Sequence, residues 1–156
     1  MLKQLERLSI TAEGRYATSP ELQFIRDYIS TIELRLSAYE KIRDNEDEII
    51  TRLQKMMTEA QPDIFHHNSQ DQSAKCKHDC QIVLRNTIAA MLIDDLDRLR
   101  EHILVWQCSI IKAFKEERIA AAVYTTMPKA IEQFLTPEEF ALIKPVLQLN
   151  NAVLAC

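Results

Sequence analysis

The chain has 156 residues, 47% of them hydrophobic and 27% charged, with a formal net charge of −4. This composition is typical of a globular protein with one core, and without long runs of charge it gives no indication of a nucleic-acid partner. The single glycine, Gly14, argues against glycine-rich phosphate loops and sheets with many tight turns. No window approaches the roughly 18 apolar residues of a membrane span. Residues 1–10 do not resemble a signal peptide, so we expect a cytoplasmic protein without membrane insertion.

The first residues of the chain predict two amphipathic helices. The first helix is short, fades around residues 12–14 and has its apolar face at Leu2, Leu5 and Leu8. The second helix is expected to start at Ser19-Pro20-Glu21, because serine is a good N-cap, proline suits the first helical position and an acid suits the first turn. Its apolar residues follow in steps of three and four: Leu22, Ile25, Ile29, Ile32, Leu36 and Tyr39.

A third helix and a polar loop are predicted next. Asn45 is placed to cap this helix, with Glu48 reaching back from the third position. The apolar face of the helix consists of Ile49, Ile50, Leu53, Met56 and Met57. Pro62 ends the helix, and residues 61–74, which are polar and lack a helical period, are predicted to form a loop.

From Lys75 the helical pattern runs without glycine or proline as far as Pro128. A compact domain is expected to break so long a helix, and Asp94-Asp95 is the predicted position. The stretch Thr136-Pro137-Glu138-Glu139 predicts another capped helix start, and Pro145 is expected to kink or split the helix that follows. No segment alternates with a period of two, so we predict an all-α fold, globin-like rather than a four-helix bundle.

One short stretch contains several residues that could bind a metal, bind a ligand or react. It contains Cys76, His78, Asp79 and Cys80. His66 and His67 could complete a zinc site with Cys76 and Cys80, but the spacing is not a usual zinc pattern. A disulfide between Cys76 and Cys80 is possible, but one helical turn rarely gives the required geometry. A catalytic cysteine lacks a base, because His78 points away from Cys76 on a helix. The remaining interpretation is a pair of buried, inert cysteines at a helix start.

Asp79 does not fit the interpretation of an inert helix start. It lies three residues after Cys76, on the same helical face, at the point where the helix becomes apolar. A buried carboxylate needs a donor partner, and the sequence identifies none. Because no acid–base or nucleophile–base pair is identifiable either, an enzyme is not expected.

Two longer stretches, residues 12–50 and 76–95, resemble the phycobiliprotein family, the globin-like antenna proteins of cyanobacterial and red-algal phycobilisomes. The first stretch has a Gly-basic-Tyr turn, a long helix carrying an arginine, and an Ile-x-x-Asn junction at Ile42 to Asn45. The second matches the family signature at Cys76, Asp79, Leu84, Arg85, Ala90, Met91 and Asp95. The resemblance covers nearly the whole chain and is nearest to allophycocyanin-like subunits, because the loop before Cys76 is short.

The resemblance implies one globin-like phycobiliprotein domain over residues 1–156 with an additional N-terminal helical pair. Residues 1–17 are expected to form an N-terminal helical extension that contacts another subunit, because Leu2, Leu5 and Leu8 are too many apolar residues for a solvated tail. The resemblance also implies a linear tetrapyrrole (bilin), phycocyanobilin or a similar one. Cys76 would hold the bilin by a thioether, and Asp79 would accept hydrogen bonds from its pyrrole N–H groups. The cofactor-binding residues implied in this way are Cys76, Lys77, His78, Asp79 and Arg85.

The chain departs from the family pattern at positions that matter for binding and assembly. His78 stands where the family has an arginine that pairs with a bilin propionate, and Lys77 or Lys75 is the candidate substitute. Thr11 stands where the family has an aspartate. That aspartate and the arginine matched by Arg85 help to join the α and β subunits, so the usual heterodimer is in question.

These observations favour a bilin-binding protein for light harvesting in or near the phycobilisome, on the cytoplasmic face of the thylakoid. One alternative is a bilin-associated globin outside the antenna, a carrier or regulator of bilin synthesis with reversible or no bilin binding. Another is a globin-like sensor without bilin, for which His102 is the candidate heme ligand. The expected partners are a second copy or a related phycobiliprotein subunit, and a bilin lyase or bilin-synthesis enzyme. No metal site is predicted.

Overall fold

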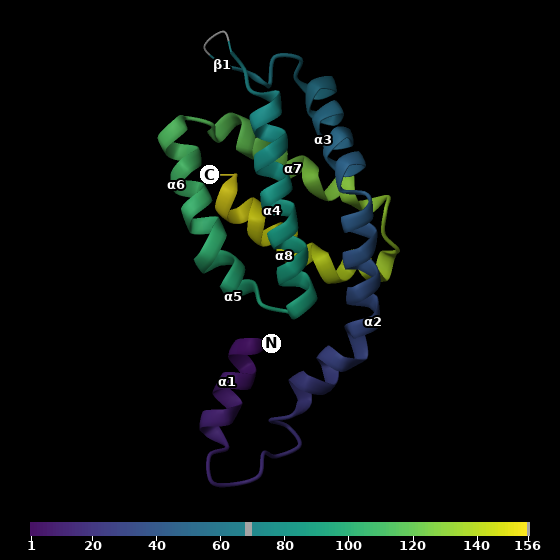
Figure 1. Ribbon diagram of the computed structural model, residues 1–156, viewed down its shortest axis with the longest axis vertical. Coiled ribbons are helices and arrows are strands. Elements are labelled where there is room, and N and C mark those ends of the chain that lie inside the picture. The colour runs from purple at the N-terminus through teal and green to yellow at the C-terminus, as the bar shows by residue number, and fades with distance from the viewer. Residues whose placement is uncertain (68–69, 156) are drawn as a thin grey trace.

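The chain folds into helices joined by short connections in the computed structural model, which describes residues 1–67 and 70–155 (Figure 1). In chain order the elements are α1 (Leu2–Thr11), α2 (Gln23–Asp44), α3 (Glu46–Ala60), β1 (His66–His67), β2 (Gln70–Asp71), α4 (Ser73–Ile93), α5 (Leu96–Leu99), η1 (Arg100–Leu104), α6 (Val105–Phe114), α7 (Glu117–Glu132) and α8 (Pro137–Leu154). The π-helical turn η1 joins α5 to α6 without a break. The predicted all-α class is confirmed, and the two-residue strands only pair with each other inside the predicted loop.

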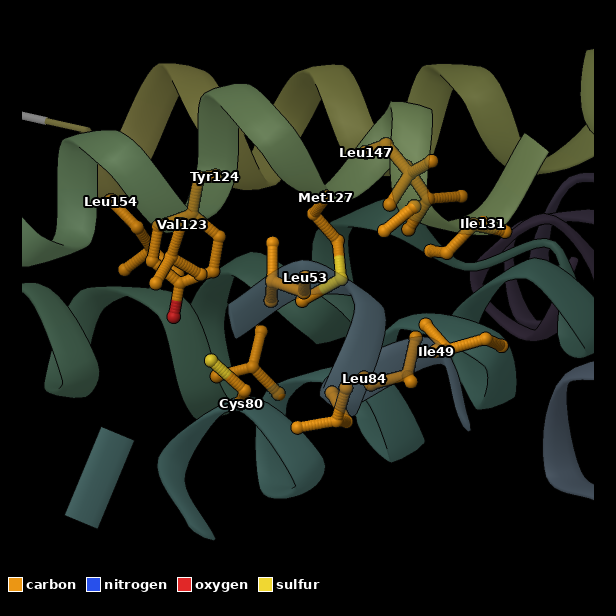
Figure 2. Packing of buried hydrophobic residues seen from close by; sticks show 14 of the residues in the cluster. Ile49, Leu53, Cys80, Leu84, Val123, Tyr124, Met127, Ile131, Leu147 and Leu154 are labelled. Carbon is orange, nitrogen blue, oxygen red and sulfur yellow. The ribbon is translucent and has the colours of Figure 1, made fainter. Parts of the chain in front are cut away.

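The hydrophobic core lies where α2, α3, α4, α7 and α8 pack together. Helix α7 packs against α3 and α8, and α4 packs against α2, α3 and α8. Figure 2 shows side chains from four of these helices meeting in the core: Leu53, Leu84, Met127, Ile131 and Leu147. Helix α1 contributes no buried side chain and lies at one end of the molecule, away from this core (Figure 1).

The predicted break after α4 is confirmed. Asp94 has a left-handed backbone with a φ of 52°, and the Asp95 carboxylate accepts a hydrogen bond of 3.1 Å from the Arg98 N–H at the start of α5. A second break, between α6 and α7, was not predicted. It occurs at Lys115, which is also left-handed with a φ of 58°. Glycine usually marks such a helix end, so a lysine there leaves no signal in the sequence.

The N-terminal region differs from the prediction. The two predicted N-terminal helices are present as α1 and α2, but α2 begins at Gln23 rather than at Ser19-Pro20. The Glu21 carboxylate accepts hydrogen bonds from the Arg15 guanidinium and from the Thr18 N–H, each at 2.7 Å. The Thr18 carbonyl accepts from the Leu22 N–H at 3.2 Å, so an irregular turn precedes the regular helix and follows Gly14, which has a φ of 76°.

Four other local predictions can be compared with the structure, and three of them differ from it. The Asn45 side chain does not cap α3; its Nδ2 donates to the Lys41 carbonyl at 2.7 Å. Pro145 does not split α8, which continues to Leu154. Helix α4 begins at Ser73, two residues before the expected Lys75. Helix α3 ends at Ala60, which agrees with Pro62 as the predicted stop.

Two polar contacts attach α2 to the helices that carry the core. Arg35 is buried and donates from Nη1 to the Met91 carbonyl and from Nη2 to Asp94 Oδ1, at 3.2 Å for the latter. The Met91 carbonyl also accepts from the Asp94 N–H, so the Arg35 bonds add to the cap of α4 and connect it to α2. At α8, Glu139 accepts bonds from Ser37 and Lys41 of α2, at 2.7 Å each to Oε1. The position of α4, and therefore of its first turns, depends on α2 through the first contact.

Candidate functional site

A pocket opens beside the first two turns of α4, against α6 and the start of α7. Its walls include both cysteines of the unusual stretch, and we call it the Cys76 pocket. Its cavity volume is about 40 Å³, within about 400 Å³ of empty space that includes open solvent at its mouth. The lining residues used below are Lys75, Cys76, Asp79, Cys80, Glu116 and Tyr124. The lining is otherwise mainly apolar, as in most small-molecule sites.

Cys76 and Cys80 lie one helical turn apart in this wall. Their Sγ atoms are 3.8 Å from each other, and both are free thiols, so the disulfide considered from the sequence is not formed. The hydrogen bond with Cys76, followed by burial, raises the pKa of the Cys80 thiol well above its ordinary value. Cys80 is therefore protonated at neutral pH.

Asp79 presents a carboxylate to the pocket, and the described residues give it no partner. Among residues 1–67 and 70–155, no donor makes a hydrogen bond or ion pair with it within the usual distances. Burial raises the pKa of Asp79; Lys75 and His78 oppose this effect, and Glu116 adds to it. A half-buried carboxylate in this condition is ready for a ligand that brings its own N–H donors.

The Tyr124 hydroxyl lies on the opposite wall. Tyr124 comes from α7 and is buried, and its hydroxyl points toward Cys80 (Figure 2). Burial, together with the neighbouring Cys80, Cys76 and Asp79, raises the pKa of Tyr124, so the phenol stays neutral. A neutral phenol can donate a hydrogen bond into the pocket.

Lys75 and Glu116 form an ion pair at the mouth of the pocket. The Lys75 ammonium donates to Glu116 Oε1 and lies 4.6 Å from the centre of the Phe114 ring. The pair connects the first turn of α4 to the junction of α6 and α7. It therefore places one charge of each sign beside Asp79 without neutralising the Asp79 carboxylate directly.

The remaining predicted site residues lie outside the pocket. Lys77 pairs with Asp47 at 3.2 Å, and Arg85 pairs with Glu46 at 2.6 Å, both near the start of α3. His78 is exposed and does not line the pocket. The structure thus brings Cys76 and Asp79 together, and the cofactor-binding roles of Lys77, His78 and Arg85 stay predictions.

The sequence also suggested a zinc site and a heme ligand as alternatives. Within the described parts of the chain, no three His, Cys, Asp or Glu side chains gather in a way that could hold a metal ion. His66 is exposed in β1, and the side chain of His67 lies outside what the structure describes. His102 is exposed on η1 and lines a separate cavity toward the C-terminal end of α4.

Sequence reasoning missed three contributors to the pocket. Tyr124 occupies an ordinary apolar position in α7, and Gln107 and Glu116 come from the region where the second helix break was not predicted. None of them stands in a motif with Cys76. Only the packing of α6 and α7 against α4 brings them to it.

Comparison with known proteins adds one positive finding. The family model described as "Phycobilisome protein" matches residues 8–153, which is most of the chain. No curated protein matches it. Across residues 1–67 and 70–155, the helices lack the length and apolar character needed to cross a membrane.

Proposed function

Because the chain belongs to the phycobilisome protein family, we propose that it binds a linear tetrapyrrole in the Cys76 pocket. The observation that carries this proposal is Asp79. It is a carboxylate that lines an apolar pocket, three residues from a free thiol, with no donor from the described residues. Bilins supply pyrrole N–H donors and a side chain to which a thiol can add, so the residues present fit such a group.

Each residue has a distinct role in this proposal. Cys76 would hold the bilin through its sulfur, by addition of the thiol to an unsaturated side chain of the first ring. Asp79 would accept hydrogen bonds from the pyrrole N–H groups. The apolar walls and Tyr124 exclude water. When bound, the bilin supplies visible-light absorption and fluorescence, which depend on how rigidly the rings are held.

The direct test uses the unmodified chain. It is purified from cells that make phycocyanobilin, denatured in acid, and examined for absorption and for zinc-enhanced fluorescence after electrophoresis. We expect a visible absorption band that persists after denaturation, because a thioether survives unfolding. A protein that emerges colourless from pigment-making cells would contradict covalent binding.

We propose light harvesting in or near the phycobilisome as the role of the pigmented protein, at the cytoplasmic face of the thylakoid. One observation favours the second candidate, a carrier or regulator of bilin synthesis outside the antenna. Arg85 matches the arginine that helps to join subunits in the family, yet here it makes bonds of 2.6 and 2.7 Å to Glu46 of its own chain. A tagged copy expressed in phycobilisome-containing cells separates the two: an antenna component sediments with phycobilisomes, and a carrier does not.

Asp79→Asn is predicted to have opposite effects on the bilin-free and the pigmented protein. Burial holds the pKa of Asp79 above its ordinary value, so the ionised form destabilises the bilin-free fold at pH 7. The substitution should therefore raise the free energy of unfolding by up to about 1 kcal/mol after solvent screening, and this gain should vanish below the ordinary aspartate pKa of about 4. The pigmented variant should have a weaker, blue-shifted red band and lower fluorescence.

Urea denaturation at pH 7 and pH 3 measures the first effect, and absorption and emission spectra measure the second. The matched control is Glu33→Gln, which changes an exposed carboxylate on α2 and should alter stability by less than about 0.5 kcal/mol. If Asp79→Asn destabilises the bilin-free protein and leaves the spectra unchanged, Asp79 serves the fold and not the pigment.

Self-association through α1 is the next prediction, with a second copy or a related subunit as partner. Helix α1 exposes Leu2 at 46%, Leu5 at 37% and Ile10 at 68%. Its contacts with the rest of the chain include the Lys3–Glu101 pair at 3.0 Å and a bond from the Met1 ammonium to the Asp94 carbonyl. An amphipathic helix with this apolar face open is expected to cover it with another chain. Sedimentation should give a dimer or larger species for the full chain, and a monomer after removal of residues 1–17.

The double variant Leu2→Glu with Leu5→Glu is the matched control for that truncation. It keeps α1 and its Lys3 contact but places charge on the apolar face, so it should also be monomeric. A full-length chain that is already monomeric at micromolar concentration would disprove this assembly.

A further inference from the structure

We propose that Cys76 and Cys80 form a redox switch in which oxidation joins the two thiols as a disulfide and withdraws Cys76 from pigment attachment. This inference rests on the proposed function, because it concerns when Cys76 is available to a bilin. The observation behind it is the pair itself: two free thiols in one pocket wall, with their sulfur atoms 3.8 Å apart.

The position of the pair on α4 permits the bond. Residues one helical turn apart have Cα atoms about 6 Å apart, within the range that a disulfide spans. Cys76 is the fourth residue of a helix that begins at Ser73, and the N-cap residue Gln72 makes no side-chain hydrogen bond to the helix. Asp71 and Gln54 hold the backbone of Ser73, so the two sulfur atoms must approach through side-chain rotation and a local shift of the turn between them.

The same geometry makes the bond easy to reverse. A disulfide between successive turns of a helix is distorted from its preferred shape, and distorted disulfides are reduced more readily than structural ones. The cross-link would close a loop of very few residues, so it would stabilise the fold little. These properties suit a reversible switch rather than a permanent structural bond.

The exposed fractions of the two thiols indicate which one reacts first with an oxidant. Cys76 is 8% exposed and Cys80 2%, so a small disulfide oxidant such as oxidised glutathione, entering the pocket, meets Cys76 first. The Cys76 sulfur loses its proton to solvent and attacks the oxidant, forming a mixed disulfide and releasing one thiolate. Cys80 then loses its proton, attacks the Cys76 sulfur and releases the second thiolate. Two electrons pass from the cysteine pair to the oxidant. The two protons lost by the cysteines protonate the two released thiolates, which gives two small thiols.

The surroundings of Cys80 favour its role as the second thiol. The hydrogen bond with Cys76 and burial raise the pKa of Cys80, so it is a poor nucleophile toward a molecule in solvent. Its attack on the mixed disulfide is intramolecular and needs no entry of a further reactant, so proximity compensates for its low ionisation. Cys108 does not line the pocket and has no part in this step.

Trypsin allows a direct test, because it cleaves after Lys75, Lys77 and Arg85. This separates Cys76 and Cys80 into the peptides 76–77 and 78–85. The full-length bilin-free chain is treated with oxidised glutathione, alkylated, digested and mapped by mass spectrometry. We expect the two peptides to be joined by a disulfide that dithiothreitol removes. The oxidised and reduced proteins are then incubated with a desalted extract of pigment-making cells, and covalent pigment is measured after acid denaturation.

Pigment loading of the wild type should fall in proportion to the joined fraction and return after reduction. Cys80→Ser is the matched control: it retains Cys76 but cannot form the bond. After oxidation and brief exposure to reduced glutathione, which removes mixed disulfides, this variant should load pigment as well as its untreated sample does. Cys80→Ala replaces it if the serine variant fails to fold.

The outcomes separate this inference from the proposed function. A reduced protein that loads pigment while peptides 76–77 and 78–85 never join would overturn the switch and leave the function standing. Loading that is unaffected by a complete 76–80 disulfide would also overturn the switch, and would move the attachment site away from Cys76. If the reduced protein takes no pigment, here or in pigment-making cells, the proposed function fails and the switch with it.

Discussion

Replacing Cys76 with alanine is expected to abolish covalent pigment attachment, whereas Cys80→Ala is expected to retain it. The two thiols lie in the same pocket wall, but Cys76 is the more accessible and has the signature position relative to Asp79. Cys80 is almost fully buried, and its raised pKa keeps it protonated. The effect is therefore all or none for one substitution and small for its neighbour.

Acid-denatured spectra of the two variants, expressed in pigment-making cells, measure this difference. Urea denaturation of the bilin-free proteins provides the control, since either substitution in a packed wall should cost roughly 1 to 3 kcal/mol of stability. Denatured Cys76→Ala protein that is still coloured would place the thioether elsewhere, at Cys80 or Cys108. Equal loss of stability with no change in colour would mean that both cysteines only pack the helix start.

Lys41→Met is expected to destabilise the fold by about 1 to 3 kcal/mol, because it removes the partly exposed counter-ion of the buried Glu139 carboxylate. The Lys41 ammonium is 2.7 and 2.8 Å from the two Glu139 oxygens, and the Glu139 side chain is only 3% exposed. Ser37 and the Thr136 N–H remain as neutral donors, so the carboxylate is weakened but not isolated. Urea denaturation at pH 7 measures the change in the free energy of unfolding.

Lys55→Met is the matched control, since it breaks an exposed pair on α3 in which Lys55 lies 3.9 Å from Glu59. That substitution should cost less than about 1 kcal/mol. If both methionine variants lose the same amount of stability, the Lys41–Glu139 pair contributes no more to the free energy of unfolding than an exposed pair does.

The Glu139 contact also predicts the direction of acid unfolding. Burial alone would raise the pKa of Glu139, but the hydrogen bonds from Lys41, Ser37 and the Thr136 N–H outweigh it and lower the pKa. The stabilisation is therefore present above the ordinary glutamate pKa of about 4.3 and is lost as the pH falls through the lower folded-state value. In Lys41→Met the carboxyl protonates more readily, so its acid unfolding should move to higher pH.

Features that depend on neighbours in the sequence could be predicted from it. The capping box at α8 forms as expected, because Thr136 and Glu139 lie within one turn and each satisfies the other's backbone N–H. The end of α4 at Asp94 and the shared face of Cys76 and Asp79 follow for the same reason. The start of α2 shows the limit of local prediction, because Glu21 also bonds to Arg15 and the regular helix begins only at Gln23.

The sequence by itself determined the all-α class, most helix positions, and the candidate pair Cys76 and Asp79, since helical period and spacing are local properties. Only the tertiary structure decided that Asp79 lacks a partner among the described residues, that Tyr124 faces Cys80 across a pocket, and that Arg85 bonds to Glu46. These contacts join residues far apart in the chain. Their formation depends on how the apolar faces of whole helices pack, and no spacing within one segment encodes that packing.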